Sequence, residues 1–187
     1  MKKIGIFASG TGTNFEALAD SDEIKELADI EIMVCDKPHA LVIEKAEKRN
    51  IKTFVFNPKA YENKKAYEKE ILDKVKDLDY IFLAGYMRIL TGDFLEKFPG
   101  KVINIHPSLL PKYKGIESIK RAYEDREEYI GVTIHYVNEE IDGGEILAQD
   151  KFKVDYKMDL DQVEAQVHKI EHKLYVKTAA EILKGEK

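Results

Sequence analysis

Residues 3–14 read Lys-Ile-Gly-Ile-Phe-Ala-Ser-Gly-Thr-Gly-Thr-Asn. The apolar run over residues 3–8 predicts a buried strand, and the two glycines that follow predict a tight turn. Residues 14–19 then predict the opening of a helix. A strand, a glycine turn and a helix in this order form a typical first unit of an open α/β sheet.

The same alternation continues through the first half of the chain. Further strands are expected at residues 30–35, 53–56, 80–84 and 102–106, and helices at residues 40–49 and from about 59 to 75. The strands at 80–84 and 102–106 are apolar on both faces, which is typical of parallel strands buried between two helix layers. We therefore expect a doubly wound α/β fold with a mostly parallel sheet.

The second half of the chain has a different pattern. Residues 131–136 and 146–154 predict two strands without a helix between them, which we expect to pair antiparallel at the sheet edge. We expect a long helix in the last part of the chain. Asp159 and Gln162 form a capping-box pattern, which predicts where this helix begins. Apolar residues at helical spacing mark its buried face: Leu160, Val163, Val167, Ile170 and Leu174. We expect residues 1–187 to form a single domain.

Composition limits the class of function. Lys and Arg number 30 against 35 Asp and Glu, a formal net charge of −5, which argues against binding nucleic acid through bulk positive charge. Cys35 is the single cysteine, so an intrachain disulfide and a cysteine-based metal cluster are excluded. No apolar run approaches the roughly 18 residues that span a bilayer, and the apolar start is too short for an export signal. We expect a cytoplasmic protein with no membrane partner.

The glycine turn at residues 9–14 is a candidate phosphate site, because glycine lets the backbone approach an anion and a helix N-terminus offers free N–H groups. An ordinary turn without a ligand is the alternative. The Gly-Lys-Ser/Thr of nucleoside triphosphate loops is missing, and Phe15 replaces the third glycine of the dinucleotide fingerprint. A nicotinamide dinucleotide stays a weaker alternative, since Asp36 stands where a ribose-binding acid would stand.

Asn104 and His106 are candidate catalytic residues. They lie two apart in a predicted strand, so their side chains emerge on the same face at the carboxyl end, where open α/β sheets bind ligands. Histidine is the most frequent acid–base residue in enzymes. Taken alone, a strand-end histidine is more often a hydrogen-bonded structural residue, and both interpretations stay open at this point.

The segment from Asn104 to Tyr113, Asn-Ile-His-Pro-Ser-Leu-Leu-Pro-Lys-Tyr, resembles the signature of the folate-dependent formyltransferases. The resemblance runs from Ile4 to the last helix and is closer to the phosphoribosylglycinamide formyltransferases. It also rests on residues 9–14, 83–90 and 142–144. It implies the Rossmann-like fold of that family, with 10-formyltetrahydrofolate as co-substrate, glycinamide ribonucleotide as acceptor and no metal.

The resemblance also assigns residues. The catalytic residues would be Asn104, His106 and Asp142. The ribonucleotide would contact Gly10, Thr11, Gly12, Thr13, Asn14 and Glu171. The folate would contact Lys64, Met87, Arg88, Ile89, Leu90 and Asn104. In the implied reaction an amine attacks the formyl carbon, Asn104 and His106 stabilise the oxyanion, and Asp142 favours the protonated imidazole.

The chain departs from the family pattern at several positions. Lys114 replaces a proline, Lys64 an arginine, and His168 a glutamine. Lysine keeps the charge of arginine but loses its bidentate geometry. Asp36 replaces an asparagine after the second strand. None of these changes removes a catalytic residue, but together they leave room for a different acceptor amine.

Other functions are weighed against this one. His168 and His172 belong to an H-x-x-E-H pattern that zinc proteases use, with His135 or Asp142 needed as a third ligand. A basic cluster of four residues with tyrosines among them suggests RNA: Lys112, Lys114, Lys120 and Arg121. Formylation of an amino sugar or of a transfer RNA, and hydrolysis of the formyl folate, use the same Asn-His segment. The oligomeric state, monomer or homodimer, stays open.

Overall fold

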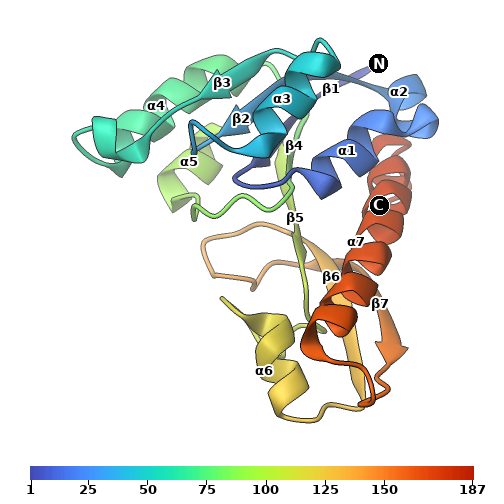
Figure 1. Cartoon of the computed structure of the whole chain (residues 1–187). Helices are drawn as coiled ribbons and strands as arrows, with labels where there is room; N and C mark the ends of the chain where they lie inside the picture. The colour runs from blue at the N-terminus through green and yellow to red at the C-terminus, as the bar shows by residue number, and fades with distance from the viewer. The chain divides into compact units, whose positions relative to one another are not determined.

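The computed structural model describes all residues, 1–187, and its strands form one sheet in the order β3-β2-β1-β4-β5-β6-β7 (Figure 1). The strands are β1 (Lys2–Ala8), β2 (Ala28–Cys35), β3 (Thr53–Val55), β4 (Tyr80–Leu83), β5 (Lys101–His106), β6 (Tyr129–Tyr136) and β7 (Ile146–Lys153). The helices are α1 (Thr13–Asp20), α2 (Asp22–Leu27), α3 (Leu41–Lys48), α4 (Lys64–Val75), α5 (Gly92–Lys97), α6 (Ser118–Glu124) and α7 (Leu160–Leu183). The mostly parallel α/β sheet, the antiparallel edge and the long last helix confirm the predicted fold class.

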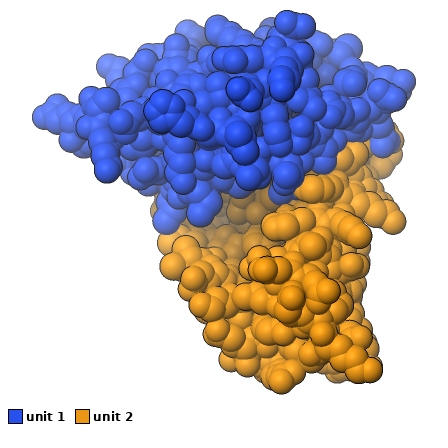
Figure 2. All heavy atoms as spheres, viewed as in Figure 1, with its two compact units in different colours: residues 1–103 blue, residues 104–187 orange.

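The chain divides into two compact units, residues 1–103 and residues 104–187 (Figure 2). A division into compact units does not show whether they fold separately. That residues 1–187 form a single domain therefore stays a prediction. None of the helices combines the length with the apolar character that crossing a membrane requires.

The first unit is built from parallel strands and the helices that connect them. β1 pairs in parallel with β2 on one side and with β4 on the other, and β2 pairs in parallel with β3. The chain thus moves outward from β1 to β3 and then returns to β4. Because crossovers between parallel strands are right-handed, the connections before and after this reversal cover opposite faces. The reversal between β1 and β4 is the position where such sheets leave room for a ligand.

Buried side chains fix these strands. Ile6, Phe7 and Phe82 have no measurable exposure, as expected for strands with apolar residues on both faces. Phe15 on α1 is also fully buried. The position that a dinucleotide fold keeps as glycine is therefore filled by an aromatic ring, which agrees with the argument against a dinucleotide.

The second unit pairs two antiparallel strands and packs a long helix on them. β6 and β7 run antiparallel from Tyr129 opposite Lys153 to His135 opposite Ile146, with an irregularity near the His135 end. α7 contacts both strands. Its capping box is present, since the Asp159 side chain accepts from the Gln162 N–H and the Gln162 side chain accepts in return.

One predicted boundary is wrong and three helices were not predicted. The helix expected from residue 59 begins at Lys64, because Asn63 is extended and its side chain accepts a hydrogen bond from the Ala66 N–H. A short 3-10 turn, Pro58–Ala60, precedes it. The helices α2, α5 and α6 have six or seven residues each, too few to show a clear apolar period.

Gly12 is needed for the packing of the glycine turn, independently of any ligand. Its φ is +78°, and an added Cβ would lie 2.6 Å from the Val42 Cγ2 atom. Gly10 has no atom within 4 Å of an added Cβ. We expect Gly12→Ala to lower the free energy of unfolding by about 1–3 kcal/mol, through strain and overpacking.

The measurement is urea unfolding followed by circular dichroism, since the chain has no tryptophan. Gly10→Ala is the matched control and should unfold at the wild-type urea concentration. Equal midpoints for Gly12→Ala and wild type would contradict the packing role.

Candidate active site

His106 ends β5 and is buried, with 6% of its surface exposed. Its Nε2 lies 2.8 Å from the carbonyl oxygen of Tyr113, which can only accept, so Nε2 carries a proton and donates. The Ser118 hydroxyl lies 3.1 Å from the same nitrogen and donates its own proton to the Gly115 carbonyl. This arrangement fixes the ring orientation and leaves Nδ1 as the edge available for chemistry.

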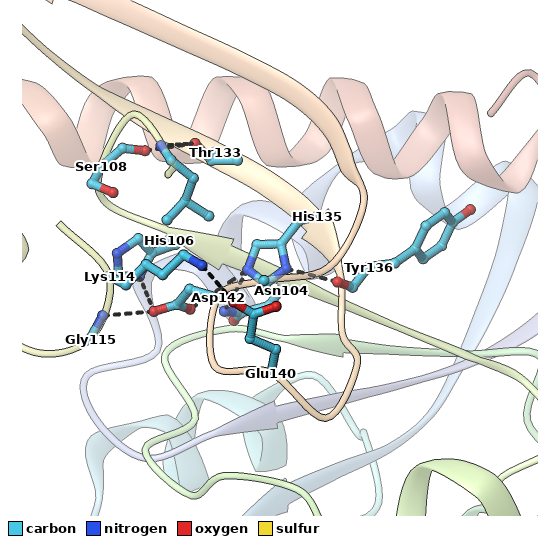
Figure 3. Close-up of polar contacts among 12 residues, drawn as sticks. Asn104, His106, Ser108, Lys114, Gly115, Thr133, His135, Tyr136, Glu140 and Asp142 are labelled. Carbon is cyan, nitrogen blue, oxygen red and sulfur yellow. Dashed lines mark hydrogen bonds and ion pairs between the residues drawn. The ribbon is translucent and has the colours of Figure 1, made fainter. Parts of the chain in front are cut away.

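Asp142 lies against that edge (Figure 3). Its Oδ2 is 3.5 Å from His106 Nδ1 and accepts a hydrogen bond of 2.8 Å from the Gly115 N–H. The Asp142 backbone is left-handed, with φ +51°, and a side chain at Gly144 in the same turn would overlap the Tyr136 carbonyl. The turn therefore fixes the carboxylate beside the imidazole, so that a proton held on Nδ1 has an anionic partner.

Asn104 shares this cluster through His135. The Nδ1 of His135 lies 2.8 Å from the Tyr136 carbonyl oxygen and donates to it. The other nitrogen, Nε2, then accepts in the neutral ring and lies 3.3 Å from Asn104 Nδ2. Burial lowers the pKa of His135, which keeps the ring neutral. One amide N–H of Asn104 is thereby held by His135, and the second is left for a ligand.

The loop after β5 is strained and held at several points. Tyr113 and Glu117 have φ of +57° and +52°, values that cost free energy for residues other than glycine. Arg121 donates to the carbonyl oxygens of Ile116 and Lys114. Together with Asp142, three left-handed residues other than glycine lie in the loops that contact His106 or its partners. Backbone strain of this kind is concentrated at active sites and ligand-binding sites.

Thr133 on β6 anchors the start of this loop. It has no exposed surface, donates to the Ser108 carbonyl at 2.7 Å and accepts from the Leu110 N–H at 3.1 Å. Gln149 on β7 donates to the Thr133 hydroxyl and to the Leu110 carbonyl. The Ser-Leu-Leu segment that follows His106 thus has its backbone groups satisfied by the antiparallel edge, which fixes where the loop leaves the sheet.

The glycine turn of the first unit can accommodate an anion. Gly12 is the N-cap of α1 and has no side chain to cap it, so the N–H groups of the first helical turn are not capped by a side chain. Gly10 is exposed and leaves open space where a Cβ would stand. The buried Oδ1 of Asn14 has no hydrogen-bond partner, so no contact of this oxygen opposes a rotation of the amide that would direct its N–H groups at an anion.

The segment after β4 presents apolar side chains. Met87 and Ile89 are 64% and 53% exposed, whereas Leu90 is buried. The Met87 N–H donates to the Ser9 hydroxyl at 2.8 Å, and Thr91 donates to the buried Glu68 carboxylate through both its N–H and its hydroxyl. Exposed apolar side chains on a fixed backbone are a suitable surface for a flat ring system.

Known proteins resemble this chain over almost its full length. The formyl transferase family model matches residues 2–179. The chain belongs to the formyl transferase family. A phosphoribosylglycinamide formyltransferase of Bacillus subtilis (strain 168) is 43% identical over the full length of both chains. The crystal structure of glycinamide ribonucleotide transformylase 1 from Geobacillus kaustophilus has a TM-score of 0.93 and 42% identity, covering 98% of this chain and 99% of that one. A Haemophilus influenzae phosphoribosylglycinamide formyltransferase is 39% identical and covers 94% of this chain.

The structure brings together the three catalytic candidates of this formyl transferase, since Asn104, His106 and Asp142 lie in one cluster. Lys64 is the first residue of α4 and is half-buried, and Glu171 on α7 is buried beside His168.

The zinc alternative gains no support from the structure. His168 Nδ1 lies 2.8 Å from Glu171 Oε2, and this ion pair raises the pKa of His168. No group of three or more His, Cys, Asp or Glu side chains is arranged to hold a metal ion. The H-x-x-E-H pattern on α7 is therefore explained by a contact between neighbouring helical residues.

The basic cluster is largely engaged within the protein. Lys112 pairs with Glu127 at 3.1 Å, and Lys114 pairs with Glu140 at 2.9 Å. Arg121 donates to backbone carbonyls, as described above. Two of the four cationic side chains are thus paired with carboxylates and a third is held by backbone carbonyls, which lowers the positive charge that this surface offers to RNA.

Sequence reasoning missed His135 as a part of the site and treated it only as a spare metal ligand. It also missed Ser118 and the Tyr113 carbonyl, which fix the His106 ring. One signal was present in the sequence. Thr133 and His135 lie two residues apart in β6, so their side chains point to the same face of a strand whose buried positions are otherwise apolar.

The histidines His135 and His168 should titrate on opposite sides of the usual histidine pKa of about 6.5. Burial lowers the pKa of His135, and the ion pair with Glu171 raises that of His168. His135 therefore costs stability as pH falls below about 6.5, because the unfolded chain takes up the proton first. His168 contributes stability below that pH and loses it as pH rises through its folded pKa.

The measurement is a pH titration of the ring nitrogens by NMR on histidine-labelled protein. The chain has five histidines, and His→Gln variants assign the signals. A midpoint for His135 above that of His168 would contradict the environments described.

Proposed function

We propose that this chain transfers the formyl group of 10-formyltetrahydrofolate to the amine of glycinamide ribonucleotide, as a phosphoribosylglycinamide formyltransferase. The observation that carries the proposal is the cluster of an amide, an imidazole and a carboxylate at Asn104, His106 and Asp142. The names of the full-length relatives support the same reaction. The formyl folate is a co-substrate and the reaction needs no metal.

Asn104 serves as an oxyanion donor in this proposal. Its amide keeps one N–H on His135 and directs the other at the formyl oxygen. When the neutral amine attacks the formyl carbon, a C–N bond forms and the carbonyl electron pair moves to oxygen. A hydrogen-bond donor held at that oxygen is worth about 10²–10³ in rate.

His106 and Asp142 serve in the two proton transfers of this proposed reaction. The attacking amine becomes cationic and gives one proton to water beside Asp142. The bond from the formyl carbon to the folate nitrogen then breaks, and His106 gives that nitrogen the proton from its Nδ1. The proton taken from the amine returns to the imidazole, so the site ends as it began. The contact of 3.5 Å between His106 and Asp142 supports this exchange.

The binding residues are proposed on the family pattern and on the local structure. The phosphate and ribose of the acceptor are held by Gly10, Thr11, Gly12, Thr13, Asn14 and Glu171. The folate is held by Lys64, Met87, Arg88, Ile89, Leu90 and Asn104. The uncapped start of α1 and the exposed Met87 and Ile89 support these two assignments.

The setting of this reaction is also part of the proposal. We place the enzyme in the cytoplasm, with small molecules as its partners and without nucleic acid or membrane contact. Its net charge of −5 and the internal pairing of the basic cluster support this.

Loss of either proton-transfer residue of the cluster should abolish most turnover. We expect His106→Ala and Asp142→Asn each to lower kcat by roughly 10²–10⁴, because each removes a proton-transfer group. The assay follows deformylated folate with purified protein, 10-formyltetrahydrofolate and glycinamide ribonucleotide.

Matched controls change the same residue types on the surface. His39→Ala and Asp150→Asn should keep wild-type rates, since both residues are exposed. Circular dichroism checks that all four variants are folded. Near-normal turnover in His106→Ala or Asp142→Asn would reject the proton-transfer role of that residue. If the wild-type protein transferred the formyl group only to another amine or to water, glycinamide ribonucleotide would not be the acceptor.

Gly10 tests the phosphate assignment. A methyl group at this position meets no protein atom within 4 Å, so it should leave stability unchanged while narrowing the space for an anion. We expect Gly10→Ala to raise KM for the ribonucleotide about tenfold, which corresponds to about 1.4 kcal/mol. KM for the folate should stay at the wild-type value. Unchanged KM values for both substrates would place the phosphate elsewhere.

A further inference from the structure

Three loops of the first unit meet at one buried carboxylate. Asp36 follows β2, and its side chain has no exposed surface. Its Oδ1 accepts a hydrogen bond of 2.5 Å from the Ser9 hydroxyl, which follows β1. Its Oδ2 accepts one of 3.0 Å from Nε of Arg88, which follows β4. The Ser9 hydroxyl oxygen in turn accepts from the Met87 N–H at 2.8 Å.

Both oxygens of this carboxylate are therefore used to hold other loops. An isolated charge removed from water is costly, and Arg88 is the cation that compensates it. The Arg88 side chain is 42% exposed, and its hydrogen bond to Asp36 uses only Nε. The guanidinium thus runs from a buried anchor to the surface, with its two amino groups left for a ligand.

The anchor depends on the Asp36 carboxylate itself. No group other than Ser9 and Arg88 is shown to satisfy the Asp36 carboxylate, so removing it would release both at once. Thr91 and Glu68 hold the far end of the same segment independently.

We propose that Asp36 is a positioning residue for the formyl donor: it fixes the Arg88 guanidinium and, through Ser9, the Met87 backbone. The inference rests on the proposed function, which assigns residues 87–90 to the folate. It also gives a role to a residue that differs from the asparagine of the family pattern, and that would be a ribose ligand only in a dinucleotide enzyme.

Hydrogen-bond chemistry predicts how substitutions differ. Asparagine at position 36 can accept from Arg88 through its oxygen and donate to the Ser9 oxygen through its amide, so both loops stay attached. Alanine loses both contacts. If the ordered segment falls to about a tenth of the population, the apparent Kd of the folate rises about tenfold.

The first experiment measures binding of tetrahydrofolate by calorimetry. We expect Asp36→Ala to weaken binding about tenfold and Asp36→Asn to stay within about threefold of wild type. In the assay, Asp36→Ala should raise KM for the formyl folate more than it lowers kcat. Asp20→Ala is the matched control, because it breaks another Asp–Arg pair of the same unit, with Arg49, at 2.7 Å on the surface.

A double-mutant cycle separates positioning from general destabilisation. Arg88→Met should weaken folate binding, and the loss in the double variant should be smaller than the sum of the two single losses, because after Arg88→Met only the Ser9–Met87 arm of Asp36 remains to be lost. Additive losses would overturn the proposal. The Arg88→Met and Asp36→Asn variants keep the test valid if Asp36→Ala does not fold.

Hydrogen exchange gives a readout that does not need the reaction. The Met87 amide should exchange faster in Asp36→Ala than in wild type, since its acceptor Ser9 loses its own anchor. Wild-type protein that binds no folate would reject the proposed function. Wild-type affinity and exchange in Asp36→Ala, with folate bound by the wild type, would reject the positioning role alone.

Discussion

The burial of the His106 imidazole is the constraint on which the candidate site depends. A polar group removed from water costs about 1–3 kcal/mol when it has no partner. The ring nitrogens of His106 meet the Tyr113 carbonyl and the Asp142 carboxylate, each in a different loop. Both loops contain left-handed residues, and the contacts that these loops make with the imidazole offset that strain. The ring and the loops therefore stabilise one another, and neither arrangement is favourable alone.

The parallel sheet explains why the polar groups of the first unit gather where they do. β1, β2 and β4 run in the same direction, so Ser9, Asp36 and Met87 leave the sheet at the same edge. The reversal between β1 and β4 separates the helices that would otherwise cover this edge. The interior of the strands is apolar, and a charged residue such as Asp36 is tolerated only where the strand ends and partners are within reach.

The fold was predictable where the signal is local. Apolar runs with both faces buried identified the strands, and the capping pair Asp159 and Gln162 identified α7. The short helix α6 was missed because its N-cap, Glu117, is left-handed and makes no capping bond. In the site, Asn104 and His106 follow from strand periodicity, whereas Asp142 came from the family resemblance. A hydrogen bond to the Tyr113 carbonyl leaves no trace in a sequence, since every residue has that oxygen.

The two buried carboxylates, Asp36 and Asp142, show how partner chemistry divides positioning from catalysis. Asp36 faces an arginine, which stays protonated at any physiological pH, so this ion pair has a single state and suits a fixed anchor. Asp142 faces a histidine, a side chain that can both accept and release a proton, so this contact suits proton transfer. Exchange of the two side chains would remove both the proton transfer and the fixed anchor. An arginine at position 106 could not release its proton. A histidine at position 88 would form an ion pair with Asp36 only while it is protonated. The placement of arginine and histidine, rather than of the two aspartates, therefore determines which carboxylate can take part in the reaction.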